Sequence, residues 1–105
     1  MKTENTFKKD TFYIIRAEKA GVFIGKISFV DGETVGVNSL RRLYRWSGAL
    51  DVTMIATNGV TNASGCKFSV QLPETDLSFI NNVVEMHQVS EKALISLNSV
   101  PVWKN

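Results

Sequence analysis

Three of the four arginines in this sequence lie in one short segment, together with two aromatic residues. The segment RRLYRW (41–46) contains Arg41, Arg42, Tyr44, Arg45 and Trp46. A guanidinium group presents a planar set of donors that matches a phosphate with two hydrogen bonds. Tyr and Trp side chains offer flat faces on which a nucleobase stacks. These residue types therefore indicate a site for a nucleotide, a nucleotide-derived metabolite or a short single strand.

The conformation of this segment decides which side chains would face a ligand. In a strand, Arg42, Tyr44 and Trp46 point to one face. Arg41 and Arg45 then point to the other. In a helix, Arg41 and Arg45 lie one turn apart. Either conformation brings a guanidinium group near an aromatic ring, and the sequence leaves both open.

The same segment also has a structural interpretation. Arg commonly stacks on Trp as a surface contact, and its long side chain covers apolar area beside a strand. Spacing alone favours this interpretation slightly over a ligand site.

Other residues that could carry chemistry are few. The sequence has neither of the glycine-rich phosphate-binding patterns GxxxxGK[ST] and GxGxxG. His87 is the only histidine, and it has no Cys or His cluster around it, so we expect no metal site. Cys66 is the only cysteine; it cannot form an internal disulfide, and we expect a small buried side chain.

The carboxylates give little support for catalysis. Glu74 and Asp76 flank a loop that begins at Pro73, and we expect both to be solvated. Asp51 is as well placed to pair with Arg45 as to act as an acid. Because no nucleophile, base and orienting group come together, we expect neither enzymatic activity nor a cofactor.

The composition is that of an ordinary globular chain, with 44% hydrophobic and 21% charged residues. We expect one compact domain over residues 11–105, preceded by a flexible leader over residues 1–10. The net charge of +2 is too small for a general nucleic-acid or membrane binder, so an electropositive site must come from local clustering. No stretch approaches the roughly 20 apolar residues that cross a bilayer, so we expect a soluble intracellular protein.

Strand signals dominate the first half of the domain. Residues 11–16 are rich in β-branched and aromatic types, and residues 22–30 are apolar on both faces, as in a strand covered on both sides. Asp31-Gly32 favours a tight turn, which predicts an antiparallel hairpin over residues 22–40 that RRLYRW can extend. Gly25 indicates a bulge or a close approach of two backbones.

The second half predicts a helix at 50–59, strands at 66–72 and within 81–89, and a helix at 91–99. Asn58-Gly59 ends the first helix, and Ser90 is a suitable N-cap for the second. Pro101 keeps the last residues extended, and we expect Trp103 to pack back onto the domain. The predicted fold class is α+β, with a small antiparallel sheet of about five strands, arranged as a meander or partial barrel, and two short helices.

In the order and spacing of six short elements, the sequence resembles a family of small uncharacterised tailed-phage proteins. The elements are IIR (14–16), AGVFIG (20–25), DGE (31–33), RRLYRWSGA (41–49), NGVTNASGCKF (58–68) and VPVW (100–103). They cover nearly everything after residue 11. Arg45 stands where the family pattern has an aromatic residue, which weakens the case for Arg45 as a site residue. Thr61 stands where the pattern has serine, a minor change.

The resemblance implies a phage protein that acts in the cytoplasm of the host. Phages make compact proteins that sequester nucleotide-derived signals of bacterial immunity, such as cyclic ADP-ribose variants or cyclic dinucleotides. By analogy with that class, we expect a non-catalytic homo-oligomer that sequesters such a signal. The expected ligand-binding residues are Arg16, Arg41, Arg42, Tyr44 and Trp46.

Three rival functions stay open. The first is a surface that inhibits a host protein, with aromatic residues forming a flat exposed patch. The second is a nucleic-acid-binding accessory protein, which the small net charge disfavours. The third is a hydrolase of the same signals, which requires a carboxylate or His87 to converge on the arginines.

Overall fold

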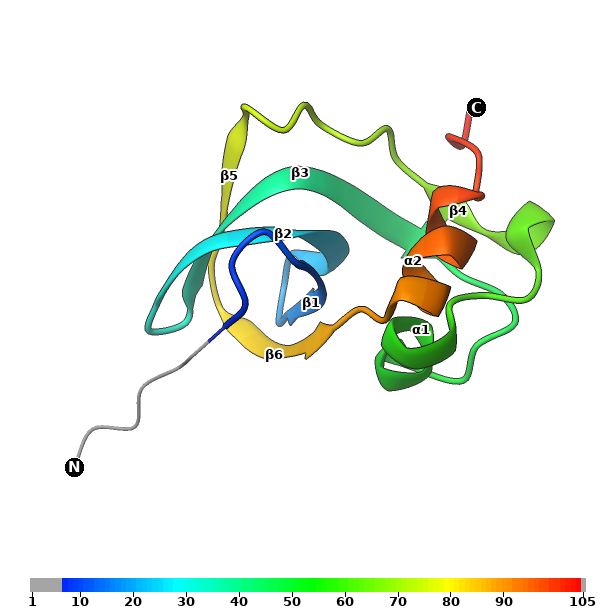
Figure 1. The fold of residues 1–105 in the computed structure, drawn as a ribbon, viewed down its shortest axis with the longest axis horizontal. Helices are drawn as coiled ribbons and strands as arrows, with labels where there is room; N and C mark the ends of the chain where they lie inside the picture. Colours follow the sequence, from blue (N-terminus) through cyan, green and yellow to red (C-terminus); the bar gives the residue numbers. More distant parts are fainter. Residues whose placement is uncertain (1–6, 105) are drawn as a thin grey trace.

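The computed structural model describes residues 7–104, which form an antiparallel sheet of six strands with two helices packed against it (Figure 1). The strands are β1 (Phe12–Ala17), β2 (Gly21–Asp31), β3 (Thr34–Arg45), β4 (Lys67–Phe68), β5 (Leu77–Ile80) and β6 (Val83–Gln88). The helices are α1 (Val52–Asn58) and α2 (Glu91–Asn98), and a short 3-10 turn covers Ala63–Gly65. This confirms the predicted α+β class.

The predicted hairpin is present and long. β1, β2 and β3 pair antiparallel in chain order, and Asp31 pairs with Thr34 across a turn in which Gly32 has a φ of +61°. A glycine adopts that left-handed conformation without steric cost. β3 continues to Arg45, so the arginine-rich segment extends the hairpin as a strand.

Gly25 marks both a bulge and a close backbone approach, as predicted. The pairing of β2 with β3 shifts between Ile24 and Lys26. A Cβ atom on Gly25 would lie 2.2 Å from Cγ1 of Val37, closer than any real contact.

The sheet curls because β5 and β6, which follow each other closely in the chain, pair with different strands of the sheet. Only Asn81 and Asn82 separate β5 from β6, yet β5 pairs with β3 and β6 pairs with β1. Since β1 and β3 flank β2, the three strands must bend towards each other to meet β5 and β6, as Figure 1 shows. The curl encloses an inner core of Tyr13, Ile15, Ala17, Phe23, Ile27, Val35, Val37, Leu40 and Ile80.

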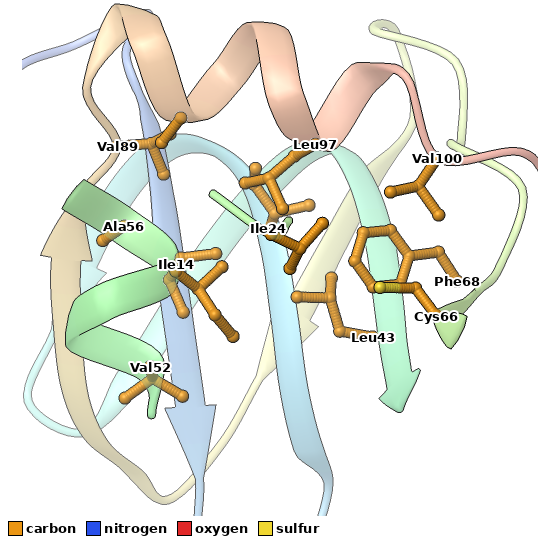
Figure 2. Close-up of a cluster of buried hydrophobic side chains, with 13 residues drawn as sticks. Ile14, Ile24, Leu43, Val52, Ala56, Cys66, Phe68, Val89, Leu97 and Val100 are labelled. Atoms are coloured by element: carbon orange, nitrogen blue, oxygen red, sulfur yellow. The ribbon is translucent and has the colours of Figure 1, made fainter. Parts of the chain in front are cut away.

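An outer core lies between the sheet and the two helices (Figure 2). Ile14, Ile24 and Leu43 reach it from the strands, and Phe68 is fully buried within it. Its other buried members are Val52, Ile55, Ala56, Val60, Cys66, Val89, Ala93, Leu97 and Val100. β1 and the first part of β2 are therefore covered on both faces, as predicted, whereas residues 28–30 at the end of β2 are only half-buried.

Side-chain caps fix the start of each helix. The Asp51 carboxylate accepts a hydrogen bond from the Met54 N–H at 3.1 Å, and the Ser90 hydroxyl accepts one from the Ala93 N–H at 3.0 Å. Both are N-cap interactions that satisfy a free helical donor. Asp51 therefore serves α1, and no ion pair joins it to Arg45 among the described residues.

The structure departs from the predicted strands in two places. Regular pairing in the predicted strand 66–72 covers only Lys67–Phe68. Beyond it, side chains join the pairing: the Ser69 carbonyl accepts from the Arg41 side chain, and the Arg42 N–H donates to the Ser69 hydroxyl. Two backbone bonds to β3 persist, from the Ser69 N–H to the Arg42 carbonyl and from the Leu72 N–H to the Leu40 carbonyl, both at 2.8 Å. β5 was not predicted, since its alternation spans only four residues.

Both ends of the described chain contact the domain. Residues 1–6 of the predicted leader lie outside the described residues; Phe7 packs against the inner core, and the Lys8 N–H donates to the Tyr13 hydroxyl at 2.9 Å. The Trp103 N–H donates to the Phe68 carbonyl at 2.9 Å, so Trp103 packs back as predicted. No helix formed by residues 7–104 has the length and apolar character needed to cross a membrane.

Candidate functional site

Arg41 is buried, with 7% of its surface exposed. Its Nε donates to the Ser69 carbonyl at 2.6 Å, and its Nη1 and Nη2 donate to the carbonyls of Leu97 at 3.2 Å and Val100 at 2.7 Å. The Leu97 carbonyl lies in the last turn of α2 and the Val100 carbonyl just after the helix end, where the helix dipole favours a cation. Burial lowers the pKa of Arg41. The side chain is thus fully engaged in holding the fold.

Arg42 lies on the opposite face of β3. Its guanidinium carbon is 4.6 Å from the centroid of the Phe23 ring, and its Nη1 donates to the Ala20 carbonyl at 3.0 Å. Phe23 belongs to the inner core, so the exposed Arg42 covers the end of that core.

Arg16 forms an ion pair with Glu85 across the β1–β6 pairing. The other carboxylate oxygen of Glu85 lies 2.6 Å from Nε2 of His87, a hydrogen bond in which the imidazole donates. The hydrogen bond from His87, with the bond and charge of Arg16, lowers the pKa of Glu85. The carboxylate therefore offsets the charge of Arg16, which reduces its attraction for an anionic ligand.

Sequence reasoning missed the Arg16–Glu85–His87 cluster. Glu85 and His87 are two residues apart on β6 and so share a face, but only the pairing of β6 with β1 brings them to Arg16. The Glu85 carboxylate thus contacts both Arg16 and His87. A hydrolase would require such a group to converge on Arg41 and Arg42, and this cluster does not.

Tyr44 faces solvent, with 56% of its surface exposed. Its ring contacts that of Trp103 edge to face, with centroids 5.9 Å apart. Trp103 is 41% exposed, and Nζ of Lys67 lies 4.9 Å from its ring centroid. Trp46 is half-buried and packs against the outer core instead.

The five predicted site residues therefore occupy five different environments. Arg41 lies beneath α2, Arg42 covers the inner core, and Arg16 pairs with Glu85. Tyr44 meets Trp103, and Trp46 faces the outer core. The structure brings none of these side chains together around a common hollow.

A different group of residues comes together at the end of β3, which we call the Tyr44–Trp103 surface. It consists of Tyr44, Arg45, Lys67 and Trp103. Arg45 and Lys67 are paired positions of β3 and β4, and within residues 7–104 neither forms an ion pair. Residues 34–50, 52–73 and 92–104 contain no Asp or Glu, so every charged side chain in these segments is positive.

Sequence reasoning found part of this surface. The sequence predicts a ligand-binding role for Tyr44, whereas it predicts only packing for Trp103 and assigns no role to Lys67. The available signal was the absence of acidic residues from three separate segments, each of which carries a cation or an exposed aromatic ring.

A cavity of about 160 Å³ lies elsewhere, between the N-terminal turn and the β2–β3 hairpin. Its lining residues are Lys9, Asp10, Lys26, Ile27, Ser28, Asn38 and Glu74. Nζ of Lys26 lies 3.1 Å from the Glu74 carboxylate. None of the predicted site residues lines this cavity. Over the described part of the chain, no group of three or more His, Cys, Asp or Glu side chains could hold a metal ion.

Comparison with known families places the chain in one of them. Residues 11–94 match the family model described as "Domain of unknown function (DUF6948)". The chain belongs to the DUF6948 family. The DUF6948 match includes Tyr44, Arg45 and Lys67 and ends before Trp103. Searches of curated proteins and of solved structures found no significant match.

Proposed function

We propose that this DUF6948 protein binds a nucleotide-derived ligand on the Tyr44–Trp103 surface without converting it. The main support is the position of the Lys67 ammonium, 4.9 Å from the centroid of a Trp103 ring that is 41% exposed. A base that stacks on an exposed aromatic ring gains about 1–3 kcal/mol. The phosphate on the ribose of the same nucleotide would lie within reach of Lys67.

The charge distribution supports the same ligand class. Arg45 and Lys67 have no acidic residue in the segments around them, so their attraction for an anion is not offset locally. Arg45 can also bind a phosphate with two parallel hydrogen bonds. This local cluster provides the electropositive site that the net charge of +2 does not.

The proposed biological role follows from the resemblance to phage proteins. The ligand would be a nucleotide-derived signal of bacterial immunity, such as a cyclic ADP-ribose variant or a cyclic dinucleotide, held in the host cytoplasm. Sequestration requires binding without turnover. None of the four side chains of the surface is a carboxylate or an imidazole, which are the usual general acids and bases.

A capture experiment tests this proposal. The purified protein is incubated with a panel of cyclic and linear nucleotides, filtered and denatured, and the released compounds are assayed. We expect intact ligand from the wild type and loss of capture in Trp103→Ala and Lys67→Ala. Ile95→Ala is the control, because Ile95 is also an exposed large apolar residue and belongs to α2, outside the surface.

Each other outcome points to a different function. Recovery of altered nucleotide would contradict sequestration and direct attention to Glu85 and His87. Capture that survives both Trp103→Ala and Lys67→Ala would place the site elsewhere. Absence of capture from the whole panel would contradict the proposal.

Inhibition of a host protein is a second candidate function. Tyr44 and Trp103 are both exposed and Arg45 follows Tyr44 in β3, and Tyr, Trp and Arg dominate the energetics of protein interfaces. This candidate predicts no nucleotide capture, together with a host protein that co-purifies with the wild type and is lost in Trp103→Ala.

A further inference from the structure

The Tyr44–Trp103 surface has a counterpart at the opposite end of β3. Figure 1 shows β5 beside the first part of β3, whereas β4 and the C-terminus lie near its other end. β3 has 12 residues, and at about 3.3 Å per residue its ends are roughly 35 Å apart along the strand.

Apolar side chains form the centre of this counterpart, which we call the Phe79 surface. Phe29, Gly36 and Phe79 occupy one row across β2, β3 and β5. The rings of Phe29 and Phe79 meet edge to face at 5.6 Å, and Phe29 fills the space above Gly36. Phe79 is 60% exposed and Leu77 is 44% exposed. Large side chains are therefore left open to solvent at this end.

β5 is also an open strand edge. It pairs with β3 on one side, and no other described strand pairs with it. Its sequence LSFI has neither the charged residue nor the proline with which exposed edge strands are commonly protected from pairing. The Phe79 surface therefore has the properties of an interface rather than of a protected edge.

The charge of this end is opposite to that of the Tyr44–Trp103 surface. Residues 27–40 and 68–91 contain no Lys or Arg. Asp31, Glu33 and Asp76 border the apolar centre, and none of them forms an ion pair among the described residues. Glu74 nearby is paired with Lys26. The rim of the Phe79 surface is thus acidic, whereas that of the Tyr44–Trp103 surface is basic.

We propose that copies of this chain associate head to tail, with the Phe79 surface of one copy on the Tyr44–Trp103 surface of the next. Each contact joins exposed aromatic rings at its centre and opposite charges at its rim. Pairing of either surface with itself would instead bring like charges together. Because the two surfaces differ and lie at opposite ends, the contact generates a ring or an open chain rather than a closed two-fold dimer.

Head-to-tail association requires no nucleotide. Because both contacts use Trp103, a nucleotide on the Tyr44–Trp103 surface and a neighbouring copy exclude each other. Ligand binding would therefore shorten the assemblies.

Complementation between two variants tests the head-to-tail arrangement directly. Phe79→Ala keeps the Tyr44–Trp103 surface, and Trp103→Ala keeps the Phe79 surface. In sedimentation without nucleotide, we expect the wild-type mass to rise with concentration beyond twice the monomer mass of 11.7 kDa and to fall at high salt. Each variant alone should stay monomeric, and an equimolar mixture should form a one-to-one dimer.

Controls separate this result from loss of folding and from the nucleotide proposal. Circular dichroism establishes that both variants are folded, and Ile95→Ala removes a side chain that is 74% exposed on α2, outside both surfaces, so it should assemble like the wild type. Nucleotide capture by monomeric Phe79→Ala tests the proposed function independently. A wild type that stays monomeric at every concentration, or folded variants whose mixture forms no dimer, would overturn the inference.

Discussion

Arg41 and Arg42 are neighbours in the chain, but their guanidinium groups lie on opposite faces of β3. Arg41 reaches the end of α2 and lies 5.0 Å from the Phe68 centroid, whereas Arg42 lies over Phe23 at the end of the inner core. Strand alternation makes this separation unavoidable. The two arginines therefore cannot bind one phosphate together. Their substitutions should also differ strongly in their effect on the stability of the protein.

Arg41→Ala should destabilise the protein strongly. The substitution leaves the carbonyls of Ser69 and Val100 without the Arg41 donor, whereas the Leu97 carbonyl keeps the Val100 N–H at 3.2 Å. Each unsatisfied buried acceptor costs about 1–3 kcal/mol. We expect the free energy of unfolding in urea to fall by about 3 kcal/mol or more. Arg42→Ala is the control and should cost less than about 1 kcal/mol, because Arg42 is exposed. Equal effects of the two substitutions would contradict this assignment.

Gly25→Ala should be more damaging than Gly36→Ala. The new methyl group at position 25 meets the buried side chain of Val37 and lies 3.1 Å from the Asn38 carbonyl. At position 36 it meets the ring of Phe29, which is partly exposed and can turn away. Thermal unfolding should show a loss of about 2 kcal/mol for Gly25→Ala and a smaller one for Gly36→Ala. The reverse order would show that the β2–β3 bulge is not packed as described.

Glu85 should make stability depend on pH in acid. Its pKa is lowered in the folded protein by the hydrogen bond from His87 and by Arg16. A carboxylate with a lowered folded pKa stabilises the protein above its unfolded pKa of about 4.3, and this contribution is lost as the pH falls through the folded value. Glu85→Gln should flatten this part of the curve of melting temperature against pH.

The matched substitution for that experiment is Glu33→Gln, because Glu33 forms no ion pair within residues 7–104. It should leave the acid part of the curve close to that of the wild type. Curves for Glu85→Gln and wild type that remain parallel down to acid pH would rule out the role given to Glu85.

Ser90→Ala should loosen the junction between the two helices. The Ser90 hydroxyl caps α2 through the Ala93 N–H and also donates to the Thr57 carbonyl at 2.7 Å, near the end of α1. Loss of an N-cap costs about 1 kcal/mol, so the free energy of unfolding should fall by at least that much. Ser90→Thr should restore most of it; a Thr variant as unstable as the Ala variant would argue against the capping role.

Local signals in the sequence were sufficient for the elements that depend on local chemistry. Asp31-Gly32 predicted the hairpin, Ser90 predicted the start of α2, and Gly25 predicted the bulge. The curl of the sheet was not predictable in the same way, because it requires β5 to pair with β3 and β6 to pair with β1. The short alternation of β5 gave no signal strong enough to reveal it.

The candidate site depended even more on tertiary structure. Alternation predicts that Arg41 and Arg42 separate in a strand, but not that α2 covers the face of Arg41. Arg16 and Glu85 are 69 residues apart, and Tyr44 meets Trp103 only because the last residues run beside Phe68. Such contacts arise from the packing of distant segments and have no local sequence signature.

The two tryptophans allow a direct test of whether nucleotide-derived ligands bind beside Trp103. Trp103 lies on the proposed surface, whereas Trp46 packs against the outer core, so their indole N–H signals report on two separate places in one spectrum. In an NMR titration of the Phe79→Ala monomer with the nucleotide panel, the Trp103 indole signal and the amides of Tyr44 and Lys67 should shift, while the Trp46 indole signal stays in place. Shifts that gather instead around Arg16 and His87 or around Lys26, or a spectrum that no nucleotide changes, would contradict binding beside Trp103.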